Sequence, residues 1–311
     1  MSLDEHVIEV RDLSRKFGAF TAVDAVNFDV RRSEIFGYLG ANGAGKSTTI
    51  RMLCGLLAPT TGHATVAGKD IARDPVGVKR SIGYMSQRFS LYLDLTVQEN
   101  LQFFAGAYGI GGKKQRVAVD AALERAQLQD SRNVITKSLP GGVRQRLALA
   151  SALIHKPVIL FLDEPTAGVS PDSRRDFWRM IRGLAREGTT LFVTTHHLDE
   201  AEYCDRIGLM VDGKLVALGT PPELKREHVA GAMFALADTD HRALRAALAG
   251  DARVLQIQPF GRRVHLRVDA ALGTPVDIQS MLTGRGVAFG EIQRIEPTLE
   301  DVFLELVGGA S

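Results

Sequence analysis

The stretch GANGAGKST, from Gly40 to Thr48, decides the fold of this chain. It fits the pattern G-x-x-x-x-G-K-[ST], in which a glycine loop turns its backbone N–H groups inward around phosphate oxygens. The apolar run at 35–39 predicts a buried strand before the loop, and residues 49–57 carry apolar side chains at helical spacing after it. Strand, glycine loop and helix in this order are the context that the motif requires, so the sequence predicts a phosphate-binding loop.

Two side chains of this loop suit a phosphate ligand with a metal ion. Lys46 offers a point charge to the outer phosphates, and the hydroxyl of Ser47 is a ligand for Mg²⁺. The N-terminus of the following helix adds the positive end of its dipole to the same site. The residues expected to hold the phosphates are Gly40, Ala41, Asn42, Gly43, Ala44, Gly45, Lys46, Ser47 and Thr48.

Composition narrows the class of protein. The chain has 311 residues and a formal net charge of +2, so no charge excess marks it as a nucleic-acid binder. Its apolar runs fall short of the ~18–20 residues that span a bilayer, and its acidic start lacks a secretion-signal core. Cys54 and Cys204 are expected to be small buried residues rather than a disulfide. We expect a cytosolic chain that reaches a membrane only through a partner.

Apolar runs alternate with helical patterns along most of the chain. A helical region is expected from Thr96 to about residue 152, with Thr96 capping a helix whose third residue is Glu99. The hairpin at 206–218 is expected to turn at Asp212-Gly213. This alternation predicts an α/β core with an inserted helical subdomain. Strands are expected at 7–13, 25–30, 82–85, 158–162 and 190–195.

A boundary is expected in the Pro- and Gly-containing stretch 219–231, because the pattern changes beyond it. Residues 232–293 predict the order β-α-β-β-α-β, with the last strand at 287–293, and 298–307 predict a tail helix. This order is typical of a small ferredoxin-like α+β module.

Four side chains supply what phosphate transfer to water needs besides the loop. Asp163 ends the buried strand at 158–162, where a carboxylate can reach Mg²⁺. Glu164, one residue on, is expected on the opposite side of the chain as the general base. His196 follows the strand at 190–195 and is a candidate contact for the γ-phosphate. Gln87 ends the strand at 82–85, where its amide can bridge water and metal, so the metal set is Ser47, Gln87 and Asp163.

The chain resembles the nucleotide-binding subunit of an ABC transporter over residues 7 to 226. The motifs GANGAGKST, IGYMSQ, LPGGVRQR, VILFLDEPTAG and TTHHLDEAE stand in the family's order. The resemblance implies a P-loop NTPase core over 1–226, with its helical subdomain at about 89–152, and an accessory domain at 232–311. It also implies ATP and Mg²⁺ as cofactors, with Phe17 stacking on the adenine.

The resemblance further implies partners. Two subunits pair head to tail, so that Gly141 and Gly142 offer backbone N–H groups to the γ-phosphate held by the other copy. We expect a second nucleotide-binding subunit in a homodimer and an integral membrane permease, with no nucleic acid. The chain would then lie in the cytoplasm, on the cytoplasmic face of the cell (inner) membrane.

Two positions depart from the family pattern. Pro140 stands where the pattern L-S-G-G-Q has serine, so neither a hydroxyl nor an N–H is available there. Losing one such donor can cost roughly 3–4 kcal/mol. Ser170 stands where an aspartate is usual, although it can cap a helix that starts at Pro171. We expect weakened closure, with hydrolysis retained.

The C-terminal stretch 297–303, PTLEDVF, resembles the tail of ATPases that serve multidrug and antibiotic-resistance exporters. An amphipathic packing helix explains its apolar residues equally well. The stretch from Phe89 to Tyr92 lies where such subunits dock a permease, although core packing accounts for its aromatic residues too.

Export powered by ATP hydrolysis is therefore the leading interpretation, and two alternatives stay open. One is a soluble ABC protein acting on ribosomes or DNA, although only one cassette and no long heptad coiled coil are present. The other is a weakly hydrolysing regulatory subunit, suggested by Pro140 and Ser170.

Overall fold

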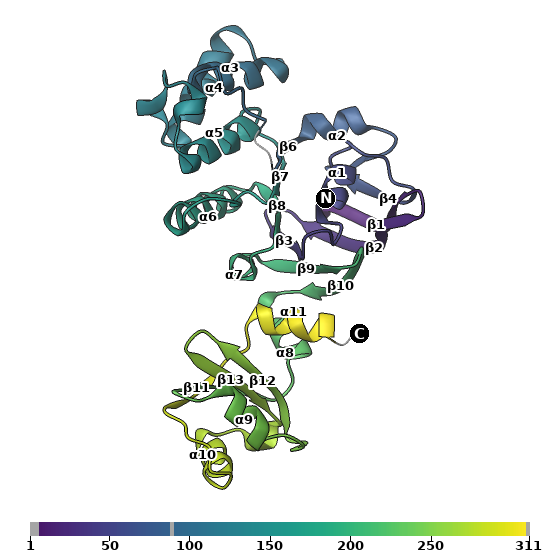
Figure 1. Ribbon diagram of the computed structural model, residues 1–311. Helices are drawn as coiled ribbons and strands as arrows, with labels where there is room; N and C mark the ends of the chain where they lie inside the picture. Colours follow the sequence, from purple (N-terminus) through teal and green to yellow (C-terminus); the bar gives the residue numbers. More distant parts are fainter. Residues whose placement is uncertain (1–5, 88–89, 309–311) are drawn as a thin grey trace. The chain divides into compact units, whose positions relative to one another are not determined.

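The computed structural model describes residues 6–87 and 90–308. The chain divides into two compact units, Met1–Pro221 and Pro222–Ser311, each of which is described by itself. Figure 1 shows their elements in sequence colours. The expected docking residue Phe89 lies outside the described residues.

A six-stranded sheet with the order β10-β9-β3-β8-β7-β6 forms the centre of the first unit. Its neighbouring strands are parallel except for β10, which returns antiparallel to β9. Every residue of β3, β7 and β8 is buried, which explains why apolar residues dominate β3 and β7 and the middle of β8. The strands are β3 (Ile35–Gly40), β6 (Ile82–Met85), β7 (Ile159–Asp163), β8 (Thr190–Thr195), β9 (Arg206–Val211) and β10 (Lys214–Gly219).

The hairpin between β9 and β10 turns where it was predicted. Asp212 and Gly213 both have positive φ, at 47° and 81°, as a tight two-residue hairpin turn requires.

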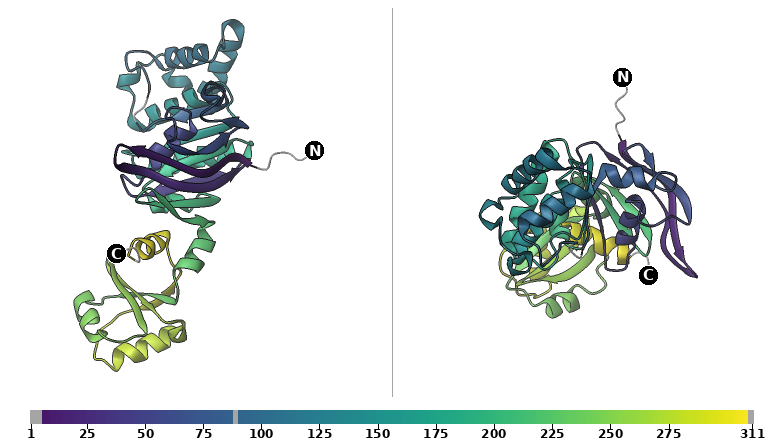
Figure 2. Two further views of the ribbon diagram at one scale, coloured as in Figure 1. Left: turned by 90° about the vertical axis from the view of Figure 1, so that its right-hand side faces the viewer. Right: turned by 90° about the horizontal axis from the view of Figure 1, so that it is seen from above.

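A second, antiparallel sheet of the first unit has the order β2-β1-β4-β5, and the left view of Figure 2 shows β1 and β2 as long neighbouring strands. Sequence patterns predicted β1 and β2 too short and missed β4 and β5. Register shifts interrupt the apolar alternation of β1, and the sequence TGHATV of β4 lacks an apolar run. The strands are β1 (His6–Phe17), β2 (Phe20–Arg31), β4 (Thr61–Val66) and β5 (Lys69–Asp70).

The helices of the first unit follow the expected order, with α2 as an unpredicted addition. The helix after the glycine loop begins at Lys46 and ends at Leu53, short of the expected residue 57. The predicted cap of α3 is confirmed: Thr96 Oγ1 accepts from the N–H of Glu99 at 3.2 Å, and the Glu99 carboxylate accepts from the N–H of Thr96 at 2.8 Å. The helices are α1 (Lys46–Leu53), α2 (Pro75–Ser81), α3 (Val97–Ala107), α4 (Gly112–Arg125), α5 (Gly141–Leu153), α6 (Pro171–Arg186) and α7 (Leu198–Ala201).

Helices α3, α4 and α5 gather in one group in Figure 1 and form the helical part of this unit. Short 3₁₀ turns at Gln129–Ser131 and Thr136–Ser138 link α4 to α5.

After α8, which was not predicted, the second unit has the predicted element order, and its sheet order β12-β13-β11-β14 with antiparallel pairs is that of a ferredoxin-like module. The last strand lies later than the predicted 287–293, and Pro259 lies in the edge strand β12. The elements are α8 (Pro221–His228), β11 (Ala232–Ala237), α9 (His241–Ala247), β12 (Val254–Phe260), β13 (Arg263–Val268), α10 (Pro275–Thr283), β14 (Ile292–Ile295) and α11 (Leu299–Gly308).

Each unit has its own apolar core. In the first, Phe36 and Phe192 lie 5.5 Å apart between ring centroids, within an aromatic cluster that includes Tyr38. Burial raises the pKa of Tyr38. In the second unit, Phe234 and Leu266 are fully buried. Both cysteines are free and buried, as predicted. Among the described residues, none of the helices combines the length and apolarity needed to cross a bilayer.

Candidate functional site

The glycine loop joins β3 to α1 in a conformation that needs glycine. Gly43 and Gly45 have φ values of +86° and +105°, and a Cβ on Gly45 would lie 2.5 Å from the carbonyl oxygen of Ala22. Within the described part of the chain, the backbone N–H groups of Gly43, Gly45, Lys46 and Ser47 donate to no acceptor. A row of free N–H groups at a helix N-terminus is an anion-binding arrangement.

Lys46 is the buried cation of this loop, with 4% of its surface exposed. Its Nζ donates to the carbonyl oxygens of Gly40 at 2.7 Å and Ala41 at 3.1 Å, and lies 3.6 Å from Oε1 of Glu164. Burial lowers the pKa of Lys46, against the opposing effect of the Glu164 and Asp163 carboxylates. The ammonium group therefore lies between the first carbonyl groups of the glycine loop and the carboxylate of Glu164.

The other predicted loop residues take their places around this row. The N–H of Ala44 donates to the carbonyl of Ala41 at 3.1 Å and closes the turn, while Asn42 is exposed and Thr48 is half-buried in the first turn of α1.

Asp163 and Ser47 meet as oxygen ligands beside the loop. The hydroxyl of Ser47 donates to Oδ1 of Asp163 at 3.1 Å, and the hydroxyl of Thr194 donates to the same oxygen at 2.7 Å. Asp163 is 3% exposed. The described residues hold no group of three or more His, Cys, Asp or Glu side chains that could form a metal cage. One carboxylate with one hydroxyl nevertheless fits Mg²⁺, which usually keeps waters and phosphate oxygens as further ligands.

Glu164 is the point where Gln87 and His196 converge. Its Oε2 accepts from Nε2 of Gln87 at 3.0 Å and lies 3.3 Å from Nδ1 of His196. The prediction that Glu164 points away from Asp163 is wrong, because both carboxylates reach the start of α1. Strand alternation stops at Asp163, since Glu164 has a left-handed backbone with φ of +49°.

The remaining predicted residues lie apart from this cluster. Phe17 ends β1 with 47% of its surface exposed, and the Arg15 guanidinium lies 4.6 Å from its ring centroid. Gly141 and Gly142 are the first residues of α5, and within the described residues no hydrogen bond joins them to the glycine loop. A Cβ on Gly142 would lie 2.8 Å from Oγ of Ser173 on α6, so this glycine permits a close approach.

The two departures in sequence have visible structural roles. Pro140 caps α5 without a side-chain hydrogen bond, and its carbonyl accepts from the N–H groups of Val143 and Arg144, both at 3.0 Å. Ser170 caps α6 as predicted, its hydroxyl accepting from the N–H of Ser173 at 3.4 Å.

Sequence reasoning missed a buried carboxylate behind the site. Glu200 is fully buried and accepts from the hydroxyls of Thr166 at 2.5 Å and Thr195 at 2.8 Å, with the Arg174 guanidinium 3.4 Å away. Through these hydrogen bonds, Glu200 links the segment that follows Glu164 to the end of β8, directly before His196. No sequence signal separates Glu200 from its exposed neighbour Asp199.

Two further contacts were also missed. Gln145 of α5 donates to the carbonyl of Pro165, directly after Glu164. Thr194 faces Asp163 in the β7–β8 register, which a correct pairing of the two predicted strands would have indicated.

Comparison with known proteins yields one consistent family. Residues 23–167 match the family described as ABC transporter. The chain is 53% identical over 223 residues to the probable multidrug ABC transporter ATP-binding protein YbhF of Escherichia coli (strain K12), covering 72% of this chain and 39% of that protein. It is 34% identical over 305 residues to the Nod factor export ATP-binding protein I of Rhizobium sp. (strain N33), covering 97% of both chains.

Among solved structures, the chain is similar to the dimeric ATP-binding cassette MJ0796 in a post-hydrolysis state bound to ADP and Pi. The TM-score is 0.63 at 26% sequence identity, covering 68% of this chain and 98% of the other.

Proposed function

The chain belongs to the family of ABC transporter ATP-binding proteins, and from this premise we propose that two copies close around MgATP, hydrolyse it and power export through a separate membrane permease. The convergence of Gln87, His196 and Lys46 on the buried carboxylate of Glu164 is the observation that carries this proposal.

In this proposal the glycine loop binds the phosphates, and the two carboxylates bind the metal and accept the proton of water. The free N–H groups and Lys46 hold the phosphates, while Ser47 and Asp163, with Gln87, hold the metal. Bound Mg²⁺ supplies charge neutralisation of the phosphate oxygens. Glu164 accepts the proton of the attacking water, Gln87 orients that water, and His196 contacts the γ-phosphate from the end of β8.

The dimer is proposed from residues that lie apart from this cluster. The exposed ring of Phe17 is available to stack on adenine, and the N-terminus of α5 at Gly141 and Gly142 is available to a second copy's γ-phosphate. Similarity to a dimeric cassette bound to ADP and Pi supports this arrangement.

The partners and location belong to the proposal as well. The chain spans 39% of the length of its YbhF relatives, so the activity of any whole transporter is inferred. We assign residues 1–226 to the nucleotide-binding domain, with its helical subdomain at about 89–152, and 232–311 to an accessory domain. We place the chain on the cytoplasmic face of the cell (inner) membrane, bound to a permease, with no nucleic-acid partner. The names of the multidrug and Nod factor relatives support export.

The weakly hydrolysing regulatory subunit is the alternative that a specific observation favours. Pro140 offers neither a hydroxyl nor an N–H at the start of α5, and its carbonyl is already used within the helix. One hydrogen bond to the second copy's nucleotide is therefore lost.

Steady-state ATP hydrolysis by the purified chain separates the two functions. We expect turnover by the parent, and loss of turnover with an ATP-trapped dimer in Glu164→Gln, followed by light scattering in MgATP. Glu9→Gln, at an exposed position of β1, is the matched control and should behave as the parent. A parent chain that dimerises in MgATP but does not hydrolyse would establish the regulatory alternative. Full turnover by Glu164→Gln would show that Glu164 does not act as the general base.

A further inference from the structure

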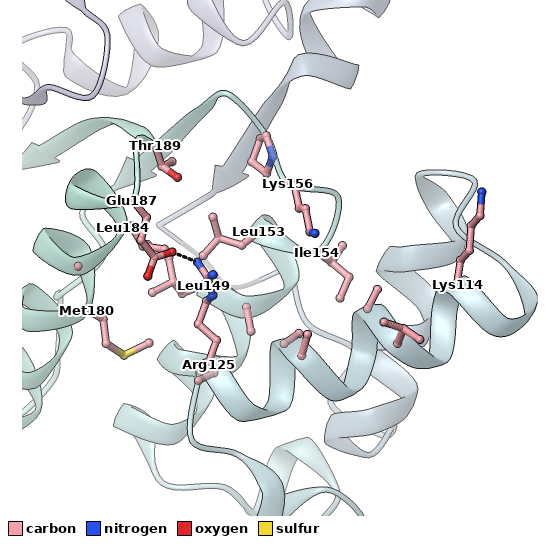
Figure 3. A pocket seen from close by; sticks show the side chains of 18 of the residues that line it. Lys114, Arg125, Leu149, Leu153, Ile154, Lys156, Met180, Leu184, Glu187 and Thr189 are labelled. Atoms are coloured by element: carbon pink, nitrogen blue, oxygen red, sulfur yellow. Dashed lines mark ion pairs between the residues drawn. The ribbon is translucent and has the colours of Figure 1, made fainter.

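A groove between α4, α5 and α6 of the first unit lies outside the site described above. It encloses about 820 Å³ and is shown in Figure 3. We call it the α4 groove. Its walls are Ala118 and Ala121 of α4, Leu153 at the end of α5, and Met180 and Leu184 of α6.

The floor of the α4 groove is apolar because α4 carries a second apolar stripe. Val119 and Leu123 are the buried residues of α4 within its own helical group. Val117, Ala118 and Ala121 line the groove instead, and Val117 is 69% exposed. Helices of globular proteins usually bury one such stripe and leave the rest polar. The second stripe is therefore apolar surface that the fold itself does not use.

Charges around the groove are not evenly placed. Lys113 and Lys114 lie at the start of α4, and Lys156 lies on the rim, as Figure 3 shows for Lys114 and Lys156. These three lysines form no ion pair within the described residues. At the other end of α4, Arg125 is paired at 2.6 Å with Glu187, the residue directly after α6, which neutralises that end.

The size and the charge pattern together specify a ligand class. Lys113 and Arg125 are separated by 12 helical steps, or about 18 Å. The result is an elongated apolar trough with two free lysines at one end, a third lysine on the rim, and an ion pair at the other end. Its volume lies within the roughly 300–1,000 Å³ of small-molecule sites. An acidic peptide helix would be matched better by cations spaced along both rims.

We propose that the α4 groove binds a free single-chain amphiphile with an anionic head group, such as a fatty acid. The acyl chain lies against Ala118, Ala121 and Leu153, and the head group lies between Lys113 and Lys114. The proposal does not depend on ATP hydrolysis, because the groove shares no residue with the Glu164 cluster.

A fluorescent fatty acid tests the proposal on the full chain. Dansyl-labelled undecanoic acid, kept below its critical micelle concentration, is titrated into the protein without nucleotide, and dodecanoate and dodecanol compete for the site. We expect binding of one probe per chain, displaced by dodecanoate at concentrations where dodecanol has little effect. Equal displacement by dodecanol, or several probes per chain, would overturn the proposal.

Two variants locate the site. Ala121→Phe fills the trough at an exposed helix position and should weaken probe binding by about tenfold or more. Its control is Ala243→Phe, at an exposed position of α9. The double variant Lys113→Gln and Lys114→Gln should weaken dodecanoate binding roughly threefold or more and leave dodecanol unchanged. Its control is Lys79→Gln with Arg80→Gln, an exposed basic pair on α2. Parent-like binding by Ala121→Phe would place the ligand elsewhere.

Two further arms exclude other occupants. Flotation with phosphatidylglycerol vesicles, compared with phosphatidylcholine vesicles, tests for a membrane lipid as the source of the anion. Vesicle binding without binding of the free fatty acid contradicts the proposal. Displacement of the probe by an acidic amphipathic peptide, but not by dodecanoate, contradicts it as well.

Discussion

At the scale of single residues, the site depends on a backbone conformation that sequence patterns do not reveal. Glu164 has φ of +49°, a conformation that costs a non-glycine residue of order 1–3 kcal/mol. Its N–H is held by the hydroxyl and carbonyl oxygens of Thr194, at 3.0 Å and 3.1 Å. The apolar run before Asp163 and Glu164 was enough to select these two residues as candidates for the site. Their common direction could not, because it depends on this contact from a neighbouring strand.

Thr194→Val tests this dependence. Valine keeps the shape but removes the hydroxyl that donates to Asp163 at 2.7 Å and accepts from the N–H of Glu164. We expect a loss of about 1.5–3 kcal/mol in the free energy of unfolding, because the Asp163 acceptor is buried and charged. Urea denaturation measures this, and ATP turnover should fall with it. Thr65→Val on β4 is the control, expected to stay within about 0.5 kcal/mol of the parent. Equal stability of Thr194→Val and the parent would contradict the account.

His155 is a second residue whose behaviour follows from its surroundings. Its Nε2 donates to the carbonyl of Ile82 at 2.9 Å, its ring stacks on Tyr108 with centroids 3.5 Å apart, and its Nδ1 has no hydrogen-bond partner among the described residues. Burial lowers the pKa of His155 below its ordinary value of 6.5. The folded chain therefore resists a proton that the unfolded chain accepts.

The pH dependence of stability has a defined sign. As the pH drops through 6.5, the unfolded chain gains the proton first, so His155 should lower the free energy of unfolding below that pH and not above it. His155→Gln keeps a donor for the Ile82 carbonyl and should lose less stability between neutral and mildly acidic pH. Parallel stability–pH curves for the parent and His155→Gln would show that His155 contributes nothing.

At the scale of elements, apolar patterning predicted the parallel strands and missed the antiparallel ones. The buried strands β3, β7 and β8 are surrounded on both faces, so apolar residues dominate β3 and β7 and occupy the middle of β8. Strand β4 is exposed over its first three residues, and its sequence carries little apolar signal. The start of α5 could be read from its glycines, but its close packing could not. At Gly142 the sequence does not name the neighbour, Ser173 of α6, that an added side chain would meet.

Gly83 of β6 lies so close to a neighbouring helix that a side chain has no room there, and its substitution has a large expected effect. A Cβ there would lie 2.3 Å from the carbonyl oxygen of Ala152 in α5. Since backbone cannot give way cheaply, Gly83→Ala should cost about 1–3 kcal/mol or more in the free energy of unfolding. Gly183→Ala in α6, where a Cβ meets nothing within 4 Å, should instead stabilise the chain by about 0.5–1 kcal/mol. Similar midpoints of urea denaturation for the two variants would refute this reasoning.

At the scale of the whole molecule, a boundary in the stretch 219–231 was predicted because the pattern of strands and helices changes beyond it, and the chain divides into compact units between Pro221 and Pro222. The ferredoxin-like order of the second unit was predicted from that pattern and confirmed by its sheet. The contacts behind the site were not predictable, because Glu200 and Gln145 meet partners that are distant in sequence. The order of helices and strands follows from local sequence patterns, whereas buried polar contacts are set by tertiary packing.

Two separate cores predict two unfolding transitions. Leu266 is fully buried in the core of the second unit, and Ile8 is fully buried in the core of the first. We expect Leu266→Ala to cost about 2–5 kcal/mol and to lower the midpoint of one calorimetric transition, while Ile8→Ala lowers the midpoint of the other. A single transition that both variants shift by the same amount would show that the units unfold together.

The edge strands of the second unit bear on how concentrated solutions of this protein behave. Strand β12 lies at one edge of the sheet and contains Pro259, and the opposite edge is the four-residue strand β14, which carries Arg294. Proline interrupts the row of donors that an incoming strand would need, and short charged edges pair poorly. This sheet therefore resists growing from molecule to molecule. Replacing Pro259 with a β-branched residue would remove that protection, and the chain would form fibrous aggregates at concentrations where the parent stays clear.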